Sequence, residues 1–350
     1  MKAKELIESL YTAGMENHVL TAAGGQMVAG LRGGRVMGIF PDTDGENLLW
    51  TPDKMKLSDW NVGGDRTWLG PESQFHVPTP DADWAATYFI PESVDPGAYQ
   101  FTAKHETWCR CVNTADIRHG GTGETCTVNI ETALSLTAPP FGREESNLSA
   151  TARRVGFIGY TLENRLEFVS GPDEAWISLW RLAQIPPGGS LRLATNGKGS
   201  VRNYFEATGP SHLAVNDDHV AFKIDGRQRH KIGVSALSAT GRMGYIRPLS
   251  NGRCSALIRS FQPVPGAVYI DTPAGDMENR FDAIQCYNDD GGYGGFGEME
   301  YHSPAVNPRQ GRNAITDVSR TWGFVGETDD VIQLSARLLN LPADQLKEGL

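Results

Sequence analysis

Short apolar or alternating runs recur between about residues 18 and 325, and turn-forming clusters separate them. Residues 35–40, 166–169, 175–180 and 267–270 are examples of such runs. The clusters between runs include Asp44-Gly45, Gly63-Gly64, Pro96-Gly97, Asp225-Gly226 and Asn251-Gly252. Runs of this length and spacing are typical of strands in a large antiparallel β-sandwich or barrel. No segment of about 20–50 residues repeats, which argues against a propeller or a solenoid.

Helical periodicity is confined to the two ends of the chain. In residues 1–15, Leu6 and Leu10 fall on one face and Gly14 follows, which predicts a short amphipathic helix. In residues 329–350, Asp329 or Asp330 can cap a helix that carries leucines at near-helical spacing. No Ser-, Pro- or charge-rich linker divides the middle. We therefore expect one mostly β domain over residues 1–350, with short N- and C-terminal helices.

Charge and hydropathy exclude two classes of partner. The 350 residues carry 32 Lys and Arg against 42 Asp and Glu, a net charge of −10, which repels phosphate backbones and disfavours nucleic acid. No apolar run approaches the roughly 18 residues that a membrane span needs. The first residues, MKAKELIESL, lack the apolar core of a signal peptide, so a cytoplasmic location is predicted.

The cysteines point to neither disulfides nor zinc. There are five, an odd number, and Cys109 and Cys111 lie two apart without a second pair to complete a zinc site. We expect buried, reduced thiols, and no metal or cofactor. Residues 292–297 match the letters of a G-x-G-x-x-G motif, but an alternating strand follows where a dinucleotide site needs a helix.

The most informative segment is the predicted strand at residues 296–302. Because side chains alternate across a sheet, Met299 and Tyr301 face one way, whereas Glu298, Glu300 and His302 face the other. Two carboxylates about 7 Å apart raise the pKa of at least one of them, towards the range useful for proton transfer. Two alternatives stay open. The row can be the solvated face of an edge strand, or its carboxylates and imidazole can bind a metal.

A second candidate segment is residues 63–72, GGDRTWLGPE. Arg66 and Trp68 share one face of an extended segment there. A sugar ring can stack its C–H face on an indole while a guanidinium donates to its hydroxyls. The alternative is a core tryptophan, with Arg66 paired to Asp65 or Glu72. Asp65 and Glu72 are also candidate binding residues.

Other polar residues are weaker candidates. Lys231 lies in an apolar strand and is either a snorkelling edge lysine or a cation in a cleft. Residues 275–279 and the segment around Asn288 can rim a pocket or bind calcium, although Asx turns are their default role. His76, His212 and His219 lie in loop-like sequence and are expected at the surface.

Four segments in succession resemble an uncharacterised bacterial branch of the galactose mutarotase-like superfamily, the relatives of aldose 1-epimerases. These are residues 34–37 (GRVM), 63–72, 231–233 (KIG) and 298–305 (EMEYHSPA). The resemblance spans nearly all of the predicted β region. It implies a β-supersandwich, two large twisted antiparallel sheets of which the concave one carries a carbohydrate cleft.

The resemblance also implies roles for individual residues. Aldose epimerases use a late Glu as base, an early Arg in sugar binding and a His of a central strand as acid. Glu298 or Glu300 resembles the late Glu, and Arg66 resembles the early Arg. The strand that resembles the central one, residues 176–182, has no histidine and offers Trp180 instead. Lys231, His302 or His76 could then supply the proton.

Two functions remain as hypotheses. The first is an enzyme that moves protons at or near the anomeric carbon of a sugar, with a glycoside hydrolase or lyase on the same scaffold as its variant. The second is a non-catalytic carbohydrate-binding or sensing protein that retains the cleft without the acid. In both, the partner is a small carbohydrate. The sequence leaves open a homodimer formed through a sheet edge or the terminal helices.

Overall fold

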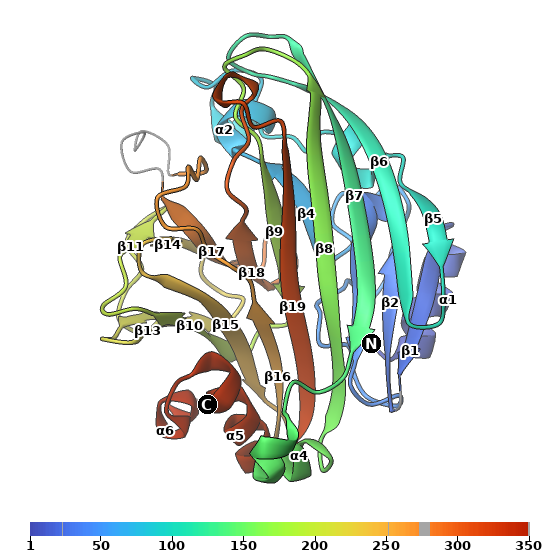
Figure 1. The fold of residues 1–350 in the computed structure, drawn as a ribbon, viewed down its shortest axis with the longest axis vertical. Helices are drawn as coiled ribbons and strands as arrows, with labels where there is room; N and C mark the ends of the chain where they lie inside the picture. The colour runs from blue at the N-terminus through green and yellow to red at the C-terminus, as the bar shows by residue number, and fades with distance from the viewer. Residues whose placement is uncertain (23, 251, 273–280, 349–350) are drawn as a thin grey trace.

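A computed structural model describes residues 1–22, 24–250, 252–272 and 281–348. In these residues two antiparallel sheets form most of the fold (Figure 1). The nine-stranded sheet has the order β1 (Asn17–Ala22), β2 (Gly25–Gly30), β3 (Arg35–Phe40), β4 (Asp65–Gly70), β9 (Ser178–Ile185), β18 (Gly297–His302), β17 (Asp282–Asn288), β14 (His230–Ser235), β11 (Val201–Asn203).

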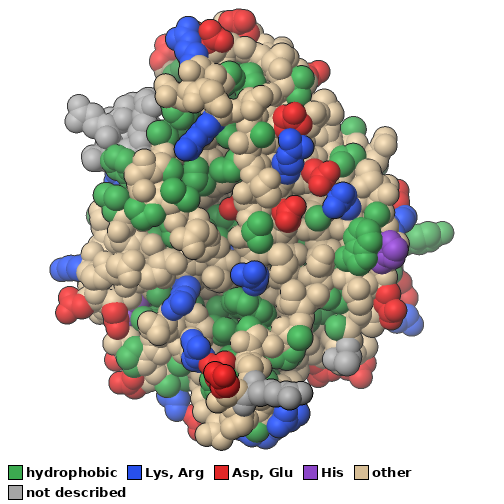
Figure 2. Space-filling model, viewed as in Figure 1, with side chains coloured by type: hydrophobic (Ala, Val, Ile, Leu, Met, Phe, Trp, Pro, Cys, Tyr) green, Lys and Arg blue, Asp and Glu red, His purple; other side chains and the backbone are tan. Residues whose placement is uncertain are grey.

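The ten-stranded sheet contains the longest strands, and several of these cross the front of the molecule in Figure 1. Its order is β12 (Leu213–Val215), β13 (His219–Ile224), β10 (Gly189–Thr195), β15 (Ala239–Pro248), β16 (Arg253–Ser260), β19 (Ala314–Glu327), β8 (Gly156–Ser170), β7 (Thr125–Thr137), β6 (Trp108–Arg118), β5 (Gln100–Lys104). On the face shown in Figure 2, Lys and Arg side chains are interspersed with Asp and Glu.

The predicted terminal helices are present and pack on the sheets. Helix α1 (Ala3–Thr12) buries Leu6 and Leu10 against residues of β2 and β3. Near the C-terminus, α5 (Thr328–Leu339) and α6 (Ala343–Lys347) pack against residues of β15, β16 and β19. Asp329 and Asp330 lie in the first turn of α5 and Glu327 holds the cap position, so the predicted cap, Asp329 or Asp330, was wrong by two or three residues.

Two features of the middle of the chain differ from the sequence prediction. Residues 267–270 were expected to form a strand, but they are an extended loop. Short helices α2 (Glu72–Phe75), α3 (Trp84–Thr87) and α4 (Ser146–Ala152) interrupt segments that were not expected to be helical. Residues 275–279, a candidate pocket rim, lie outside the described residues. The main prediction, a mostly β sandwich with helical ends, is confirmed.

The space between the sheets is mostly apolar and contains a buried ion cluster. Leucine, isoleucine and valine side chains from both sheets form the main core, with Met299 and Tyr301 among them. Within this core, Asp65 of β4 accepts hydrogen bonds from Arg181 of β9, Arg259 of β16 and the hydroxyl of Tyr160 of β8. Asp65 and Arg181 are fully buried, and Arg259 and Tyr160 are 1% exposed.

The arginines of this cluster determine the pKa and the charge of Asp65. Burial alone would raise the pKa of Asp65, but Arg181 and Arg259 outweigh burial and hold the pKa below its ordinary value. Asp65 is therefore an anion that joins two cations from different sheets. Removing one member of such a cluster leaves charges unpaired in the interior, which is costly.

We expect Asp65→Asn to lower the free energy of unfolding by about 3–5 kcal/mol, because two guanidinium groups lose their buried counter-charge. Urea denaturation measures this loss. The control is Glu131→Gln, since the Glu131–Arg110 pair lies on the exposed face of β7 and β6 at 3.6 Å and should contribute at most about 1 kcal/mol. Equal effects of the two substitutions would contradict the proposed importance of the interior cluster.

Candidate functional site

Five neighbouring strands, β4, β9, β18, β17 and β14, bring most of the predicted residues together on the outer face of the nine-stranded sheet, the face turned away from the core. In β18, Met299 and Tyr301 point into the core, so Glu298, Glu300 and His302 point outward, as the alternation predicts. The register places three outward rows side by side. These rows are Trp68, Trp180 and His302; Arg66, Leu182, Glu300 and Gln285; and Gln184, Glu298, Tyr287 and Lys231.

Two glycines set the direction in which the chain enters β4. Gly63 and Gly64 have φ of 77° and 84°, a region that favours glycine, and a Cβ on either would lie within 2.5 Å of a backbone oxygen of Trp50 or Val36. The chain therefore turns sharply into β4. Arg66 and Trp68 then lie on the outward face, with the guanidinium carbon 4.2 Å from the indole centroid.

Arg66 is paired with Glu298, not with the acids predicted as alternatives. Its Nη2 donates to Oε1 of Glu298 at 2.9 Å, and Nε2 of Gln184 donates to the same oxygen at 3.0 Å. Both members of the ion pair are largely buried, with side chains 4% and 10% exposed. This arrangement joins the two candidate segments, which are 232 residues apart in sequence.

Glu300 is the most deeply buried acid of the cluster. The indole N–H of Trp180 donates to its Oε2 at 2.8 Å, and Nζ of Lys231 lies 3.9 Å from the same oxygen. Its other oxygen, Oε1, has no hydrogen-bond partner in the described part of the chain. Burial raises the pKa of Glu300 to about 8, although the nearby ammonium of Lys231 acts to lower it.

Lys231 is a cation inside the cluster, not a snorkelling edge lysine. It is 6% exposed, and its Nζ donates to Oε2 of Glu72 at 3.0 Å. Burial alone would lower the pKa of Lys231, but Glu72 and Glu300 outweigh burial and raise it above its ordinary value. The hydroxyl of Tyr88 donates to the other oxygen of Glu72 at 2.8 Å, so α2 lies over this part of the face.

His302 and His76 are buried rather than exposed. The ring of His302 stacks on Trp180 at 5.4 Å, and burial lowers the pKa of His302 to about 3. His76 stacks on Tyr88 at 5.4 Å, its Nε2 lies 3.0 Å from the carbonyl oxygen of Leu69, and burial lowers its pKa too. Both imidazoles are therefore neutral near pH 7.

Buried polar atoms without a protein partner converge on this face. In the residues that the structure describes, they include Nε and Nη1 of Arg66, Nδ1 of His76, Oε1 of Gln184, Oε1 of Gln285, Oε1 of Glu300 and both ring nitrogens of His302, while others lie in the interior ion cluster. Most buried polar groups in proteins have a hydrogen-bond partner, so several unpartnered polar atoms on one face need an explanation. They comprise both donors and acceptors.

Two predicted binding residues lie elsewhere. Asp65 points to the opposite face of β4, where it holds the interior ion cluster, because it is one position from Arg66. Asn288 is fully buried at the end of β17, and its side chain bonds to Asp225, the N–H of Gly226 and the carbonyl of Gln228. Its role is to fix a turn. His212 and His219, expected at the surface, are 7% and 2% exposed.

Sequence reasoning missed several members of the cluster. Tyr88, Gln184, Gln285 and Tyr287 contribute side chains to it, and Oδ2 of Asp271 lies 3.8 Å from Nε2 of His302. Gln184 and Gln285 could have been found from the pattern, because each is a polar residue with an apolar residue on either side in its strand. Tyr88 and Asp271 lie in connections, where spacing carries no such signal.

Neither a metal centre nor a membrane span is found in the described residues. No three His, Cys, Asp or Glu side chains there are arranged to hold a metal ion. No helix in the same ranges is both long and apolar enough to cross a bilayer. The five cysteines are free and buried, as predicted.

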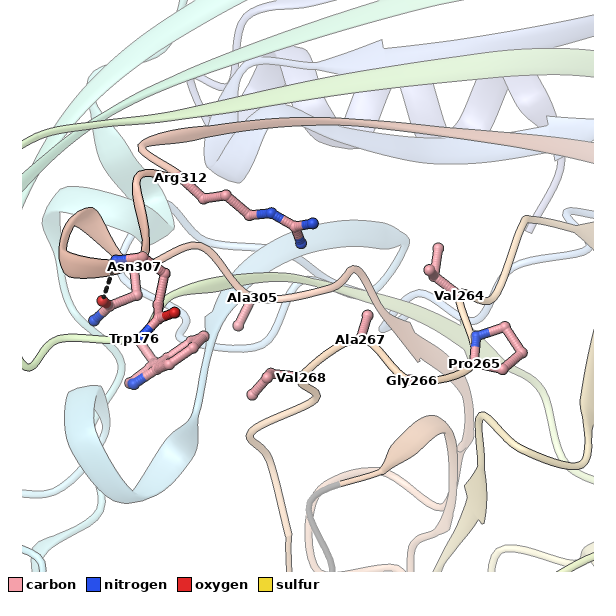
Figure 3. A pocket seen from close by; sticks show the side chains of 10 residues that line it. Trp176, Val264, Pro265, Gly266, Ala267, Val268, Ala305, Asn307 and Arg312 are labelled. Atoms are coloured by element: carbon pink, nitrogen blue, oxygen red, sulfur yellow. Dashed lines mark hydrogen bonds between the residues drawn. The ribbon is translucent and has the colours of Figure 1, made fainter.

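A surface cavity of about 430 Å³ lies near the ends of β9 and β18 and contains none of the predicted residues (Figure 3). The loop at 264–268 and the segment after β18 form its walls, and Arg312 and Trp176 project towards it. The predicted residues are instead packed together, whereas Tyr88, which binds Glu72, is 39% exposed. Glu298, Tyr287 and Lys231 are 6–8% exposed, against 0–1% for Glu300 and His302.

Two stacked antiparallel sheets with a polar cluster on the outer face of one define a galactose mutarotase-like β-supersandwich. A solved structure of an Escherichia coli K12 protein, provisionally assigned as an aldose 1-epimerase, is similar over 90% of this chain and all of its own, with a TM-score of 0.55 and 14% identity. A galactose mutarotase-like protein from Lactobacillus casei is similar over 88% of this chain and all of its own, with a TM-score of 0.51 and 8% identity. At these identities the likeness establishes the fold.

The chain belongs to DUF6786, a family of unknown function, whose model matches residues 47–350. No curated protein sequence matches the chain significantly. The predicted resemblance to an uncharacterised branch of the galactose mutarotase-like proteins is therefore confirmed.

The raised pKa of Glu300 makes a testable contribution to pH-dependent stability. Between its ordinary value of 4.5 and about 8, folded Glu300 keeps a proton that the unfolded chain releases, so this group's contribution to stability falls as pH rises through that window. We expect Glu300→Gln to become progressively more stable relative to the wild type from pH 5 to pH 8.

Urea denaturation of both proteins at several pH values measures the difference in free energy of unfolding. Glu131→Gln provides the matched control, because Glu131 is a partly exposed acid of the other sheet. A difference between wild type and Glu300→Gln that stays constant over the window would show that Glu300 titrates normally.

Proposed function

We propose that the outer face of the nine-stranded sheet binds a sugar, and that Glu300 exchanges protons with it at or near the anomeric carbon, as in an epimerase. The partner is a small carbohydrate, and no metal or cofactor takes part. The structural neighbours, a protein provisionally assigned as an aldose 1-epimerase and a galactose mutarotase-like protein, agree with this proposal at the level of the scaffold.

The observation that carries the proposal is the convergence of orphan polar atoms on one face. Arg66 contributes donors, and Glu300 and Gln184 contribute acceptors, all of them buried and without protein partners among the described residues. A sugar presents several hydroxyl groups, each able to donate and accept, so it can satisfy such a mixed set.

Glu298 and Glu300 have different roles in the proposed function. Glu298 accepts hydrogen bonds from Arg66 and Gln184, so its role is to fix the guanidinium that binds the sugar. Glu300 has a free oxygen and a pKa of about 8. A group whose pKa lies near the working pH can both take and return a proton, which is what an acid–base catalyst needs.

Lys231 is better suited than His302 to be the acid. His302 is neutral near pH 7, whereas Lys231 keeps its ammonium charge 3.9 Å from Glu300. In the forward step, Glu300 takes the proton of the anomeric hydroxyl as the ring C–O bond breaks, and Lys231 donates a proton to the ring oxygen. Ring closure on the other face returns both protons, so the protein ends unchanged.

A non-catalytic sugar-binding protein is the second candidate, and one observation favours it. Trp180 occupies the central strand where the resemblance implies a catalytic histidine, and its N–H donates to Glu300. A protein of this kind would gain thermal stability from a sugar without converting it. The Glu300 experiment below separates the two functions.

We expect Glu300→Gln to slow anomer interconversion by about 100-fold or more while sugar binding persists, since general acid–base groups contribute on this scale. Glu298→Gln should weaken binding instead, because Arg66 loses its fixed position. NMR exchange spectroscopy on a panel of aldoses measures interconversion, and thermal shift measures binding. If the wild type binds a sugar without interconverting its anomers, the second candidate, a sugar-binding protein, is favoured. If the wild type shows neither binding nor interconversion, the proposed site is refuted.

Lys231→Met provides an independent test of the charge coupling. Lys231 lowers the pKa of Glu300, so its removal should move the midpoint of the pH–rate profile to higher pH. The rate should also fall if Lys231 is the acid. A lower rate with an unchanged midpoint would mean that Lys231 does not act electrostatically on Glu300.

A further inference from the structure

We infer that the proposed sugar site extends onto an exposed aromatic pair, Trp60 and Tyr293, which binds a second sugar unit. The substrate class is then an oligosaccharide or glycoside, not only a free monosaccharide. This inference rests on the proposed function, because it places the second unit next to the first.

Two loops from distant parts of the sequence form the aromatic pair. Trp60 lies in the connection between β3 and β4, and Tyr293 lies in the connection between β17 and β18. Their ring centroids are 5.3 Å apart with the planes at 87°, so the rings form a corner. Trp60 is 47% exposed and Tyr293 is 51% exposed, although large aromatic side chains normally bury most of their surface.

Both loops are held in place by buried groups. Asp289 is fully buried, and its Oδ2 accepts the backbone N–H groups of Gly291, Tyr293 and Gly295. In the other loop, the guanidinium of Arg32 donates to the carbonyl oxygens of Leu57 and Asp59. Rings that are positioned before a ligand arrives need little further ordering, which favours binding.

A continuous series of aromatic contacts joins the pair to the cluster. A Cβ on Gly294, the residue after Tyr293, would lie 2.5 Å from the indole of Trp50, so that loop touches Trp50. Trp50 contacts Phe296 at 4.8 Å, and Phe296 lies 6.2 Å from Tyr287. Tyr287 is paired with Glu298 in the sheet. The pair therefore borders the Glu298 end of the cluster, where Glu298 is 8% exposed and Tyr287 is 7% exposed.

The surroundings of the pair favour a glycan over a protein partner. Asp59, Asn61 and Asp290 flank the two rings in sequence, and Leu57, which is 59% exposed, is the other large exposed apolar side chain of these two loops among the described residues. Protein interfaces instead use broad contiguous apolar patches. A pyranose offers an apolar C–H face about the size of one ring and hydroxyl groups around it, which matches rings set among carboxylates and an amide.

The test compares wild type with Trp60→Ala, Tyr293→Ala and the conservative variant Tyr293→Phe. Trp108→Ala is the matched control, because Trp108 is also exposed, at 36%, but lies on β6 of the other sheet. An array of mono- and oligosaccharides first identifies the sugars that the wild type binds. Each protein is then titrated with every oligosaccharide identified and, for comparison, with the monosaccharide found at the end of that oligosaccharide. Sedimentation velocity records the oligomeric state of each protein.

We expect the wild type to bind the longer glycan about three- to tenfold more tightly than the monosaccharide, the gain that one or two stacked rings provide. Trp60→Ala and Tyr293→Ala should remove this gain and leave monosaccharide binding unchanged, whereas Tyr293→Phe and Trp108→Ala should keep it. Monosaccharide binding without any gain for longer glycans would overturn this inference and leave the proposed function intact. Absence of any sugar binding would overturn both.

A dimer that dissociates in Trp60→Ala and Tyr293→Ala would also overturn the inference, since the pair would then be an interface between two copies of the chain.

Discussion

The alternation of side chains in β4, β9 and β18 is the constraint on which the rest of this structure depends. Asp65 and Arg181 point into the core and join an ion cluster that spans both sheets. Arg66, Trp180 and Glu300, each on the same strands, point to the opposite face. The interior cluster fixes these strands against the other sheet, and the outer cluster takes its geometry from them.

The outer cluster has the electrostatic features of a reactive site and the packing of a core. Two cations and several carboxylates share it, and burial moves the pKa values of Glu300 and His302 in opposite directions, to about 8 and about 3. A protein that needed only stability would gain more from apolar residues at these positions. We attribute the retained charges to the proposed chemistry, for which Glu300 holds the exchangeable proton and Lys231 remains charged.

Access to this cluster differs between its two ends. At one end Trp180 and His302 are 2% and 1% exposed, and the partly exposed Tyr88 bonds to Glu72 of α2 nearby. At the other end, Glu298 and Tyr287 retain some exposure, and aromatic residues border them. This asymmetry gives the proposed ligand a direction, with its reacting unit at Glu300 and any further unit at the aromatic pair.

The sequence by itself determined the β class, the terminal helices and the outward row of Glu298, Glu300 and His302, because strand and helix periodicities are local properties. It also paired Arg66 with Trp68 on one face. Only the tertiary structure decided which acid Arg66 meets, since Glu298 is 232 positions away. It also decided that Asp65 is interior and that the extended loop at 267–270 is not a strand, because burial and pairing depend on neighbours that are distant in sequence.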